Sequence, residues 1–282
     1  MKMKVNYSFL IFCLLMLTAF SDKSPQSGEK ASDAQIESRI DKLIGQMTLE
    51  EKVGQMTQVT LDVISRVENR QIKYPHEIDT AKLRKAIVTY NVGSILNVCS
   101  HAYTREYWYK IISAIQTMAK EKTRLGIPIL YGIDAIHGVN YTEKATLFPQ
   151  QIGLAATFNT RLAEQAASIT AYETRASYIP WNFSPVLDLG RQPAWPRFYE
   201  TFGEDVFLAK TMGSAMVYGY EGDDISNKYK VASCLKHYLG YSAPVSGKDR
   251  TPAWIPENYI REYYLPTFAE AIKSGADRKS VV

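Results

Sequence analysis

The sequence predicts an α/β fold, arranged as an incomplete (β/α)8 barrel of the TIM type. Short runs that are apolar throughout alternate with helical patterns, which is typical of parallel strands covered by helices. Polar residues follow directly after the predicted strands, where barrel active sites collect. The 282 residues contain only about four or five strand candidates, whereas a closed barrel needs eight, so we expect the barrel to be incomplete.

A doubly wound sheet is the other common arrangement of parallel strands and helices. Its nucleotide-binding members carry G-x-G-x-x-G after the first strand, or G-x-x-x-x-G-K-[ST], and the sequence contains neither motif. The barrel is favoured because several polar residues fall at or just after the carboxyl ends of predicted strands. These residues are Asp134, His137, Asp188, Arg191, Lys236 and His237.

Two helices are expected at the start of the folded region. Ser32 with Gln35, and Thr48 with Glu51, have the Ser/Thr-x-x-Glu/Gln spacing of a capping box. Apolar residues between the two boxes recur at helical spacing and form one face of a helix. They are Ile36, Ile40, Leu43, Ile44 and Met47.

The middle of the chain alternates helices and strands. A helix over residues 81–87 leads into a strand over 92–97, and a helix over 106–121 leads into a strand over 129–134. Asn159 is a good N-cap residue, and the residues after it predict a further helix.

The last third of the chain continues the alternation. Residues 178–189 and 231–239 are apolar runs, and a helix capped by Asp205 lies between them. Pro266 fits the first position of a final helix, because that position needs no backbone N–H. Residues 280–282 resemble the opening of another strand.

The first twenty residues have the pattern of a secretory signal. A basic start precedes an apolar run over residues 9–20, which is shorter than the roughly 20 residues of a membrane span. Phe20 stands where a lipoprotein signal has Cys. Residues 21–32 are polar and predict a linker, and residues 33–282 are expected to form the partial barrel, truncated at its carboxyl end. We therefore expect an exported protein, periplasmic or associated with the cell envelope, that meets a membrane only through residues 1–20.

Composition and charge exclude several classes of protein. Hydrophobic residues make up 46% and charged residues 22%, as in ordinary globular proteins. The 33 Lys and Arg residues are scattered among 29 Asp and Glu, so nucleic acid is not an expected partner. There is no C-x-x-C, H-E-x-x-H or G-x-S-x-G motif, so we expect no metal, no cofactor and no α/β-hydrolase triad. Cys99 and Cys234 are too few for a disulfide framework.

Asp134 is the first candidate site residue. It ends an apolar strand, and His137 follows three residues later in a loop bounded by glycines. A carboxylate in this place can accept hydrogen bonds from neighbouring hydroxyls of a sugar. The structural alternative is that Asp134 caps the segment after it while His137 packs under the loop.

Residues 184–205 form the most unusual stretch, with two Arg, four acids and four aromatic residues. Guanidinium groups bind hydroxyl and carboxylate oxygens, and aromatic faces cover the apolar side of a sugar ring. The alternative is a salt-bridged loop in which Arg191 pairs with Asp188, or Arg197 with Glu200.

Lys236 and His237 end the apolar run that starts at Val231. As neighbours in a strand, they are expected to point to opposite sides, so that one of them faces the barrel mouth. The alternative is a Lys that extends to solvent beside a structural His. The aromatic candidates for the mouth are Tyr141, Trp181, Phe198 and Trp254.

Five segments occur together in the order and spacing of a known family. The segments are residues 47–56, 134–138, 145–150, the Arg-rich stretch through 202–205, and 236–238. Over roughly residues 35–282 the chain therefore resembles glycoside hydrolase family 3, and within it the exported β-glucosidases.

The resemblance implies a (β/α)8-like barrel followed by an α/β sandwich. It also implies four residues that hold the non-reducing sugar, and a supporting role for the first Arg and two of the acids of the Arg-rich stretch. Pro196 stands where many members have Gly, which leaves the Arg after it in place. The implied sugar-binding residues are Asp134, Arg197, Lys236 and His237, and the implied supporting residues are Arg191, Glu200 and Asp205.

The implied activity is hydrolysis of terminal non-reducing β-D-glucosyl residues of β-glucosides or oligosaccharides. Such retaining hydrolysis uses two carboxylates about 5–5.5 Å apart. In the family one lies in a Ser-Asp-Trp-type segment and the other in the second domain, so both are expected beyond Val282 and no catalytic residue is assigned within the chain. This chain is therefore expected to be an inactive amino-terminal fragment.

Two alternatives to this activity stay open. Residues 240–254 contain no His, which disfavours the N-acetylglucosaminidase branch but does not separate β-glucosidase from β-xylosidase. The chain could also be a non-catalytic or vestigial sugar-binding protein that keeps the four binding residues.

Overall fold

The computed structural model describes residues 33–98 and 101–276, in two compact units that meet between Met47 and Thr48. The predicted signal segment, the linker and the strand over residues 280–282 lie outside the described residues. The first unit contains helix α2 (Asp33–Gln46), which confirms the first predicted helix. Its Ile36, Ile40 and Ile44 side chains are exposed.

The second unit is built on a four-stranded parallel sheet. Its order is β1-β4-β5-β6, so strands that follow one another in the chain lie side by side. Single bridges from Trp181 to Ala232 and from Val186 to Lys236 continue this order into the run 231–236. A doubly wound sheet would reverse its order at a switch point. The strands are β1 (Gln58–Thr60), β4 (Ser94–Leu96), β5 (Leu130–Ile133) and β6 (Trp181–Asn182).

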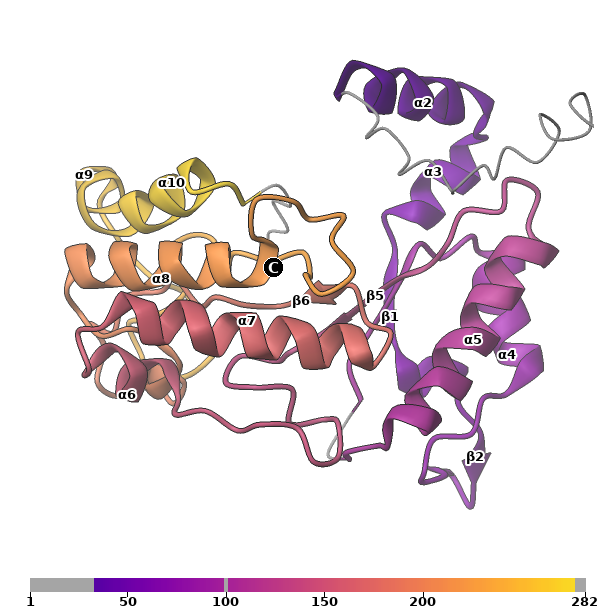
Figure 1. Cartoon of the computed structure of the whole chain (residues 1–282), viewed down its shortest axis with the longest axis horizontal. Coiled ribbons are helices and arrows are strands. Elements are labelled where there is room, and N and C mark those ends of the chain that lie inside the picture. The colour runs from indigo at the N-terminus through magenta and orange to yellow at the C-terminus, as the bar shows by residue number, and fades with distance from the viewer. Residues whose placement is uncertain (1–32, 99–100, 277–282) are drawn as a thin grey trace, which may run out of the picture. The chain divides into compact units, whose positions relative to one another are not determined.

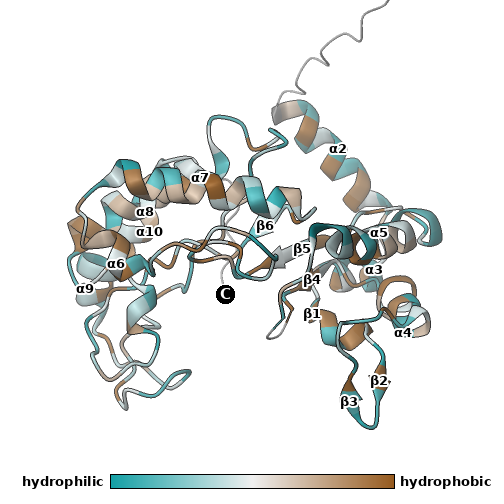
Figure 2. Ribbon diagram, turned by 60° about the horizontal axis from the view of Figure 1, so that its bottom comes forward, coloured by the Kyte–Doolittle hydropathy of each residue, from teal (hydrophilic) through white to brown (hydrophobic). Residues whose placement is uncertain are grey.

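Helices cover the sheet, as predicted for an α/β fold. Figure 1 shows α7, α8 and α10 lying one beside the next, and the contacts between these elements agree. Hydrophilic and hydrophobic residues alternate along α7, as expected for a helix with one buried face (Figure 2). The helices are α3 (Leu49–Gln55), α4 (Thr80–Arg84), α5 (Arg105–Lys122), α6 (Gln151–Ala155), α7 (Thr160–Ala176), α8 (Val206–Glu221), α9 (Glu257–Tyr259) and α10 (Leu265–Lys273).

Two hydrophobic clusters form the core of this unit. The first joins the strands β4 and β5 to helices α4 and α5, and its Ile95, Tyr131 and Ile133 have no exposed surface. The second joins α7, α8 and α10 to Leu187 and Leu235, which belong to the apolar runs 178–189 and 231–239. No helix among the described residues is both long and apolar enough to cross a membrane.

Gly132 allows β5 and β6 to pack closely. A Cβ atom at this position would come within 2.3 Å of the Phe183 ring and 2.8 Å of the Trp181 ring. Any side chain at residue 132 would therefore push Phe183 from its place beside the carboxyl end of β5.

Side chains cap three helices where the sequence predicts it, while Ser32, the predicted cap of the first helix, lies outside the described residues. Thr48 and Glu51 form the full capping box of α3, and the Asn159 side chain accepts the first N–H groups of α7. The Oδ1 atom of Asp205 accepts a hydrogen bond of 2.6 Å from the N–H of Leu208 at the start of α8. These three predictions are confirmed.

Replacing Asp205 by alanine will lower the free energy of unfolding by about 1 kcal/mol, because the first turn of α8 loses its acceptor. Urea denaturation at neutral pH measures this loss. Asp205→Asn keeps an acceptor oxygen in the same place and is expected to match the wild type closely. An equal loss in both variants would show that the cap does not stabilise α8.

The final helical region differs from its prediction. Pro266 lies in the first turn of α10, one position later than predicted, because α10 begins at Leu265. The helical region itself begins earlier, at Glu257 after Pro256, and passes through a wide π-helical segment (Ile260–Tyr264) into α10. The wider turn just before Pro266 accommodates a residue that has no N–H to donate.

Several short elements have no counterpart in the prediction. They are too short for a periodic signal, and β1 gains its strand character from pairing with β4. Strands β2 (Val67–Glu68) and β3 (Gln71–Ile72) form a hairpin that pairs two residues on each side. The missed elements also include α6 and a 3-10 helix (Leu61–Ile64).

Candidate functional site

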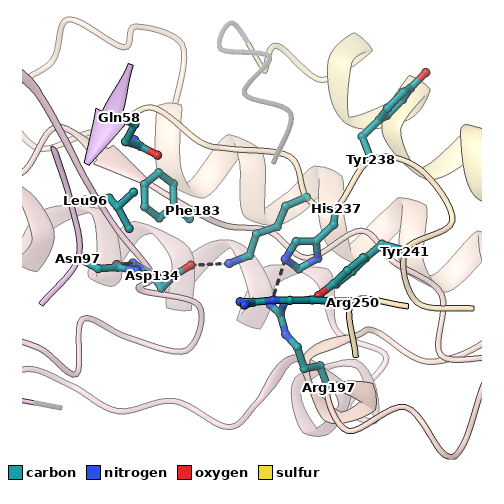
Figure 3. A pocket seen from close by; sticks show the side chains of 11 residues that line it. Gln58, Leu96, Asn97, Asp134, Phe183, Arg197, His237, Tyr238, Tyr241 and Arg250 are labelled. Atoms are coloured by element: carbon teal, nitrogen blue, oxygen red, sulfur yellow. Dashed lines mark hydrogen bonds and ion pairs between the residues drawn. The ribbon is translucent and has the colours of Figure 1, made fainter. Parts of the chain in front are cut away.

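A pocket of about 560 Å³ lies where the carboxyl ends of several strands meet, and all four predicted binding residues line it. Figure 3 shows Asn97 and Asp134 on one side, with His237, Arg197 and Tyr241 facing them across the cavity. The lining residues are Gln58, Leu96, Asn97, Asp134, Phe183, Arg197, Lys236, His237, Tyr238, Tyr241 and Arg250.

Asp134 and Lys236 form an ion pair in the pocket. The Lys236 Nζ atom lies 2.5 Å from Asp134 Oδ1, and the Asn97 amide donates to Asp134 Oδ2 at 2.6 Å. Asn97 also accepts the backbone N–H of Asp134. Buried Asn182, from β6, holds the loop after Asp134 through both backbone groups of Ala135. Asp134 is thus a positioned pocket residue rather than a local cap.

The charge of Asp134 is stabilised by its neighbours. Burial by itself would raise the pKa of this carboxyl, but the nearby Lys236 ammonium, hydrogen bonds from Lys236 and Asn97, and the charge of Arg197 together lower the pKa below its ordinary value. The carboxylate is therefore ionised at neutral pH and accepts hydrogen bonds. Its side chain keeps 33% of its surface exposed, so a ligand in the pocket can reach it.

Arg197 is held by a two-point pair with Glu200. Its Nε atom donates to Glu200 Oε1 at 3.0 Å and its Nη2 atom donates to Oε2 at 2.6 Å. A 3-10 turn (Phe198–Glu200) brings the two residues together. Burial would lower the pKa of Arg197, but the hydrogen bonds and charge of Glu200 outweigh it and raise the pKa. The supporting role implied for Glu200 agrees with this contact.

His237 lies between Asp188 and Arg197. Its Nδ1 atom is 2.6 Å from Asp188 Oδ2, and its Nε2 atom is 3.0 Å from Arg197 Nη2. Lys236 and His237 both line the pocket, so the prediction that they point to opposite sides is wrong. The strand pairing ends at Lys236, and His237 starts a turn in which side chains no longer alternate.

The loop after His237 is tied to the Arg197 segment by Asp249. Its Oδ1 atom accepts hydrogen bonds from Trp195 Nε1 at 2.9 Å and from the Tyr241 hydroxyl at 2.7 Å. Burial would raise the pKa of Asp249, but these two donors lower it. Burial and the hydrogen bond to Asp249 raise the pKa of Tyr241. Tyr241 thereby keeps its ring against His237, at a centroid distance of 4.6 Å.

The remaining polar candidates take structural positions. His137 meets the carbonyl of Phe148 at 3.1 Å and does not line the pocket. Arg191 donates to the carbonyl of Glu204, and its guanidinium lies 4.1 Å over the Tyr263 ring, so it does not pair with Asp188.

The predicted aromatic residues do not line the pocket. Trp254, the most exposed of them, keeps 81% of its surface accessible. The aromatic lining comes from Phe183, Tyr238 and Tyr241 instead. Tyr141, Trp181 and Phe198 are likewise absent from the lining.

The sequence contained a usable signal for one missed residue. Asn97 ends the predicted strand 92–97, at the same edge as Asp134, so its strand-end position marks it as a candidate. Tyr241 and Arg250 lie in an irregular loop, where no periodic pattern assigns a direction to a side chain.

The pocket suits a polyhydroxylated ring. It offers one carboxylate acceptor, cationic donors at Lys236 and Arg197, and an apolar surface at Leu96 and Phe183. Within residues 33–98 and 101–276, no group of three or more His, Cys, Asp and Glu side chains could hold a metal ion.

Comparison with known proteins identifies relatives over most of the chain. The N-terminal domain of glycosyl hydrolase family 3 matches residues 48–281. The lysosomal β-glucosidase of Dictyostelium discoideum is 46% identical over 86% of this chain and 30% of its own length. The periplasmic β-glucosidase of Salmonella typhimurium is 27% identical over 83% of this chain and 27% of its own length.

Solved structures give the same result. A β-glucosidase from Listeria innocua, in complex with glucose, matches 87% of this chain and 33% of its own, with a TM-score of 0.71 and 30% identity. The exo-1,3/1,4-β-glucanase of a Pseudoalteromonas species matches 89% of this chain and 30% of its own, with a TM-score of 0.74 and 30% identity. The chain thus spans about a third or less of the length of these relatives.

Proposed function

Since this chain belongs to glycosyl hydrolase family 3, we propose that its pocket holds the terminal non-reducing β-D-glucosyl residue of a β-glucoside or oligosaccharide. The observation that carries the proposal is the convergence of Asp134, Arg197, Lys236 and His237 on one cavity. These residues come from segments up to about a hundred positions apart, as the 102-residue separation of Asp134 and Lys236 illustrates.

Each part of the pocket has a role in this proposal. Asp134 accepts hydrogen bonds from neighbouring hydroxyls of the sugar, while Lys236 and Arg197 donate to its oxygens. Phe183, which follows β6 directly, covers the apolar face of the ring. Hydrogen bonds to charged groups are stronger than those between neutral groups, which suits a ligand rich in hydroxyls.

We assign sugar binding, and not cleavage of the glycosidic bond, to the described residues. Asp134 is the one carboxylate among the described lining residues, and it is engaged with Lys236. Retaining hydrolysis needs two carboxylates about 5–5.5 Å apart. We therefore propose that these two carboxylates lie in parts of the whole protein outside residues 33–276. The whole protein is proposed to be an exported β-glucosidase, in keeping with relatives named periplasmic and lysosomal.

Titration of the purified 282-residue chain with glucose tests the binding role, by calorimetry or by NMR chemical shifts. We expect saturable binding that weakens about tenfold or more in Asp134→Asn, because a hydrogen bond to a charged group is lost. Glu173→Gln is the matched control. That carboxylate binds Thr146 and does not line the pocket, so its affinity is expected to be unchanged.

Two outcomes would count against the proposal. A folded wild-type chain that fails to bind glucose would remove the binding role. Turnover of an aryl β-glucoside by this chain, abolished in Asp134→Ala, would show that the chemistry lies among the residues described above and not outside them.

A further inference from the structure

We infer that Asp188 is a positioning residue, which fixes the His237 ring so that its Nε2 lone pair faces Arg197 and orients that guanidinium in the pocket. Asp188 does not line the pocket and acts only through His237. The effect on sugar binding rests on the proposed function, whereas the orientation of His237 and Arg197 does not.

Asp188 is a fully buried carboxylate whose two oxygen atoms differ in their hydrogen bonds. Its side chain has no exposed surface. Oδ2 accepts both the Nδ1 proton and the backbone N–H of His237, at 2.6 and 3.0 Å. Oδ1 has no hydrogen-bond partner among the described residues. A buried oxygen without a donor costs stability, so a merely structural residue at this position would not favour a carboxylate.

The contacts of His237 determine where its ring proton lies. Asp188 Oδ2 faces His237 as an acceptor, since it already accepts the backbone N–H of that residue, so Nδ1 carries the proton that points to it. A guanidinium only donates, so Nε2 must present its lone pair to Arg197 Nη2 at 3.0 Å. The opposite tautomer, or an imidazolium, would set an N–H of His237 against an N–H of Arg197. One arrangement of the ring therefore satisfies both neighbours.

The orientation of the His237 ring affects the pocket through the hydrogen bonds of Arg197. Its Nη2 atom donates to Glu200 Oε2 and to His237 Nε2, which uses both of its protons. Its Nε atom is used by Glu200. Nη1 has only a long contact of 3.5 Å, to the Tyr241 hydroxyl. Asp188, His237 and Glu200 thus hold the guanidinium so that Nη1 is left for a ligand oxygen.

NMR of the 15N-labelled full chain tests the inference without any ligand. We expect His237, identified by the loss of its signals in His237→Gln, to show a protonated Nδ1 with a downfield proton protected from exchange, and an unprotonated Nε2. Asp188→Ala should lose that protected proton and shift the Arg197 Nε–H signal. Asp188→Asn keeps an acceptor oxygen, so its Nδ1 proton should persist but move upfield. Glu221→Gln, a buried carboxylate that binds Ser233 instead, is the matched control and should change neither signal.

Glucose titration of the same samples measures the effect of Asp188 on sugar binding. The dissociation constant should rise about tenfold in Asp188→Ala and by less in Asp188→Asn, because a misplaced Arg197 loses a charged hydrogen bond to the sugar. A wild-type His237 protonated on Nε2 would overturn the inference. So would Asp188 variants that leave the Arg197 signal unchanged. If Asp188→Ala does not fold, the His237 Nδ1–H and Arg197 Nε–H signals of Asp188→Asn test the inference instead. If the signals behave as expected but glucose does not bind, the proposed function fails and the positioning role of Asp188 stands.

Discussion

Replacing Asp134 by asparagine will lower the free energy of unfolding by about 2–3 kcal/mol at pH 7. The variant leaves Lys236, whose side chain is only 5% exposed, without its counter-charge. An unpaired buried cation is costly, but Asp134 is 33% exposed, which keeps the loss below that of a fully buried pair. Urea denaturation measures it. The double variant Asp134→Asn with Lys236→Met removes both charges and should recover part of the loss.

The same variant has a defined pH dependence. Because the folded protein lowers the pKa of Asp134 below its ordinary value of 3.8, this carboxylate stabilises the fold above that value. The stabilisation is lost as the pH falls through the lowered pKa. The difference between wild type and Asp134→Asn should therefore be constant from neutral pH to about pH 5 and shrink below about pH 4. A difference that stays constant down to acid unfolding would contradict the assigned ion pair.

Glu200→Gln is expected to destabilise the protein by about 3 kcal/mol at neutral pH, because it leaves the Arg197 guanidinium without its counter-charge. The two side chains keep only 22% and 9% of their surface exposed. Gln keeps one acceptor oxygen, so one of the two hydrogen bonds can survive. Glucose affinity should fall as well, because Arg197 gains freedom to leave the pocket.

A second Arg–Glu pair in the same chain provides the matched control. Arg261 donates to Glu257 through Nε and Nη2, but its side chain is 68% exposed and that of Glu257 is 77% exposed. Pairs exposed to water contribute little, so Glu257→Gln should leave the unfolding free energy within experimental error. Equal losses in the two variants would show that burial does not set the strength of the Arg197 pair.

Local sequence patterns predicted most of the elements. Capping side chains such as Asn159 and Asp205 bind backbone groups within three residues, so both partners of the interaction are neighbours in the sequence. Buried strands were found where they were long enough to form an apolar run, as for β5. β1 was missed because three residues, two of them polar, form a strand only through the pairing with β4.

Some residues of the candidate site were likewise predictable from local sequence, and others were not. Asp134 and Lys236 could be singled out because polar residues at the carboxyl ends of parallel strands collect at one edge. That rule does not give side-chain direction once a strand ends, so strand alternation predicted only one of Lys236 and His237 in the pocket, whereas the family resemblance implied both. Tyr241 was missed because its direction depends on Asp249 and Trp195, which are bound to each other across 54 positions of the chain.

Neighbours a few positions away were enough to predict the α/β class, the capped helices and the residues that carry charge at the strand ends. Which of those residues share a cavity, and which ion pairs and hydrogen bonds they form there, depends on tertiary contacts. Asp134 meets Lys236 across 102 positions, and Asp188 meets His237 across 49. Such contacts arise from the order of the parallel strands and from burial, which raises the cost of any charge or proton left unpaired.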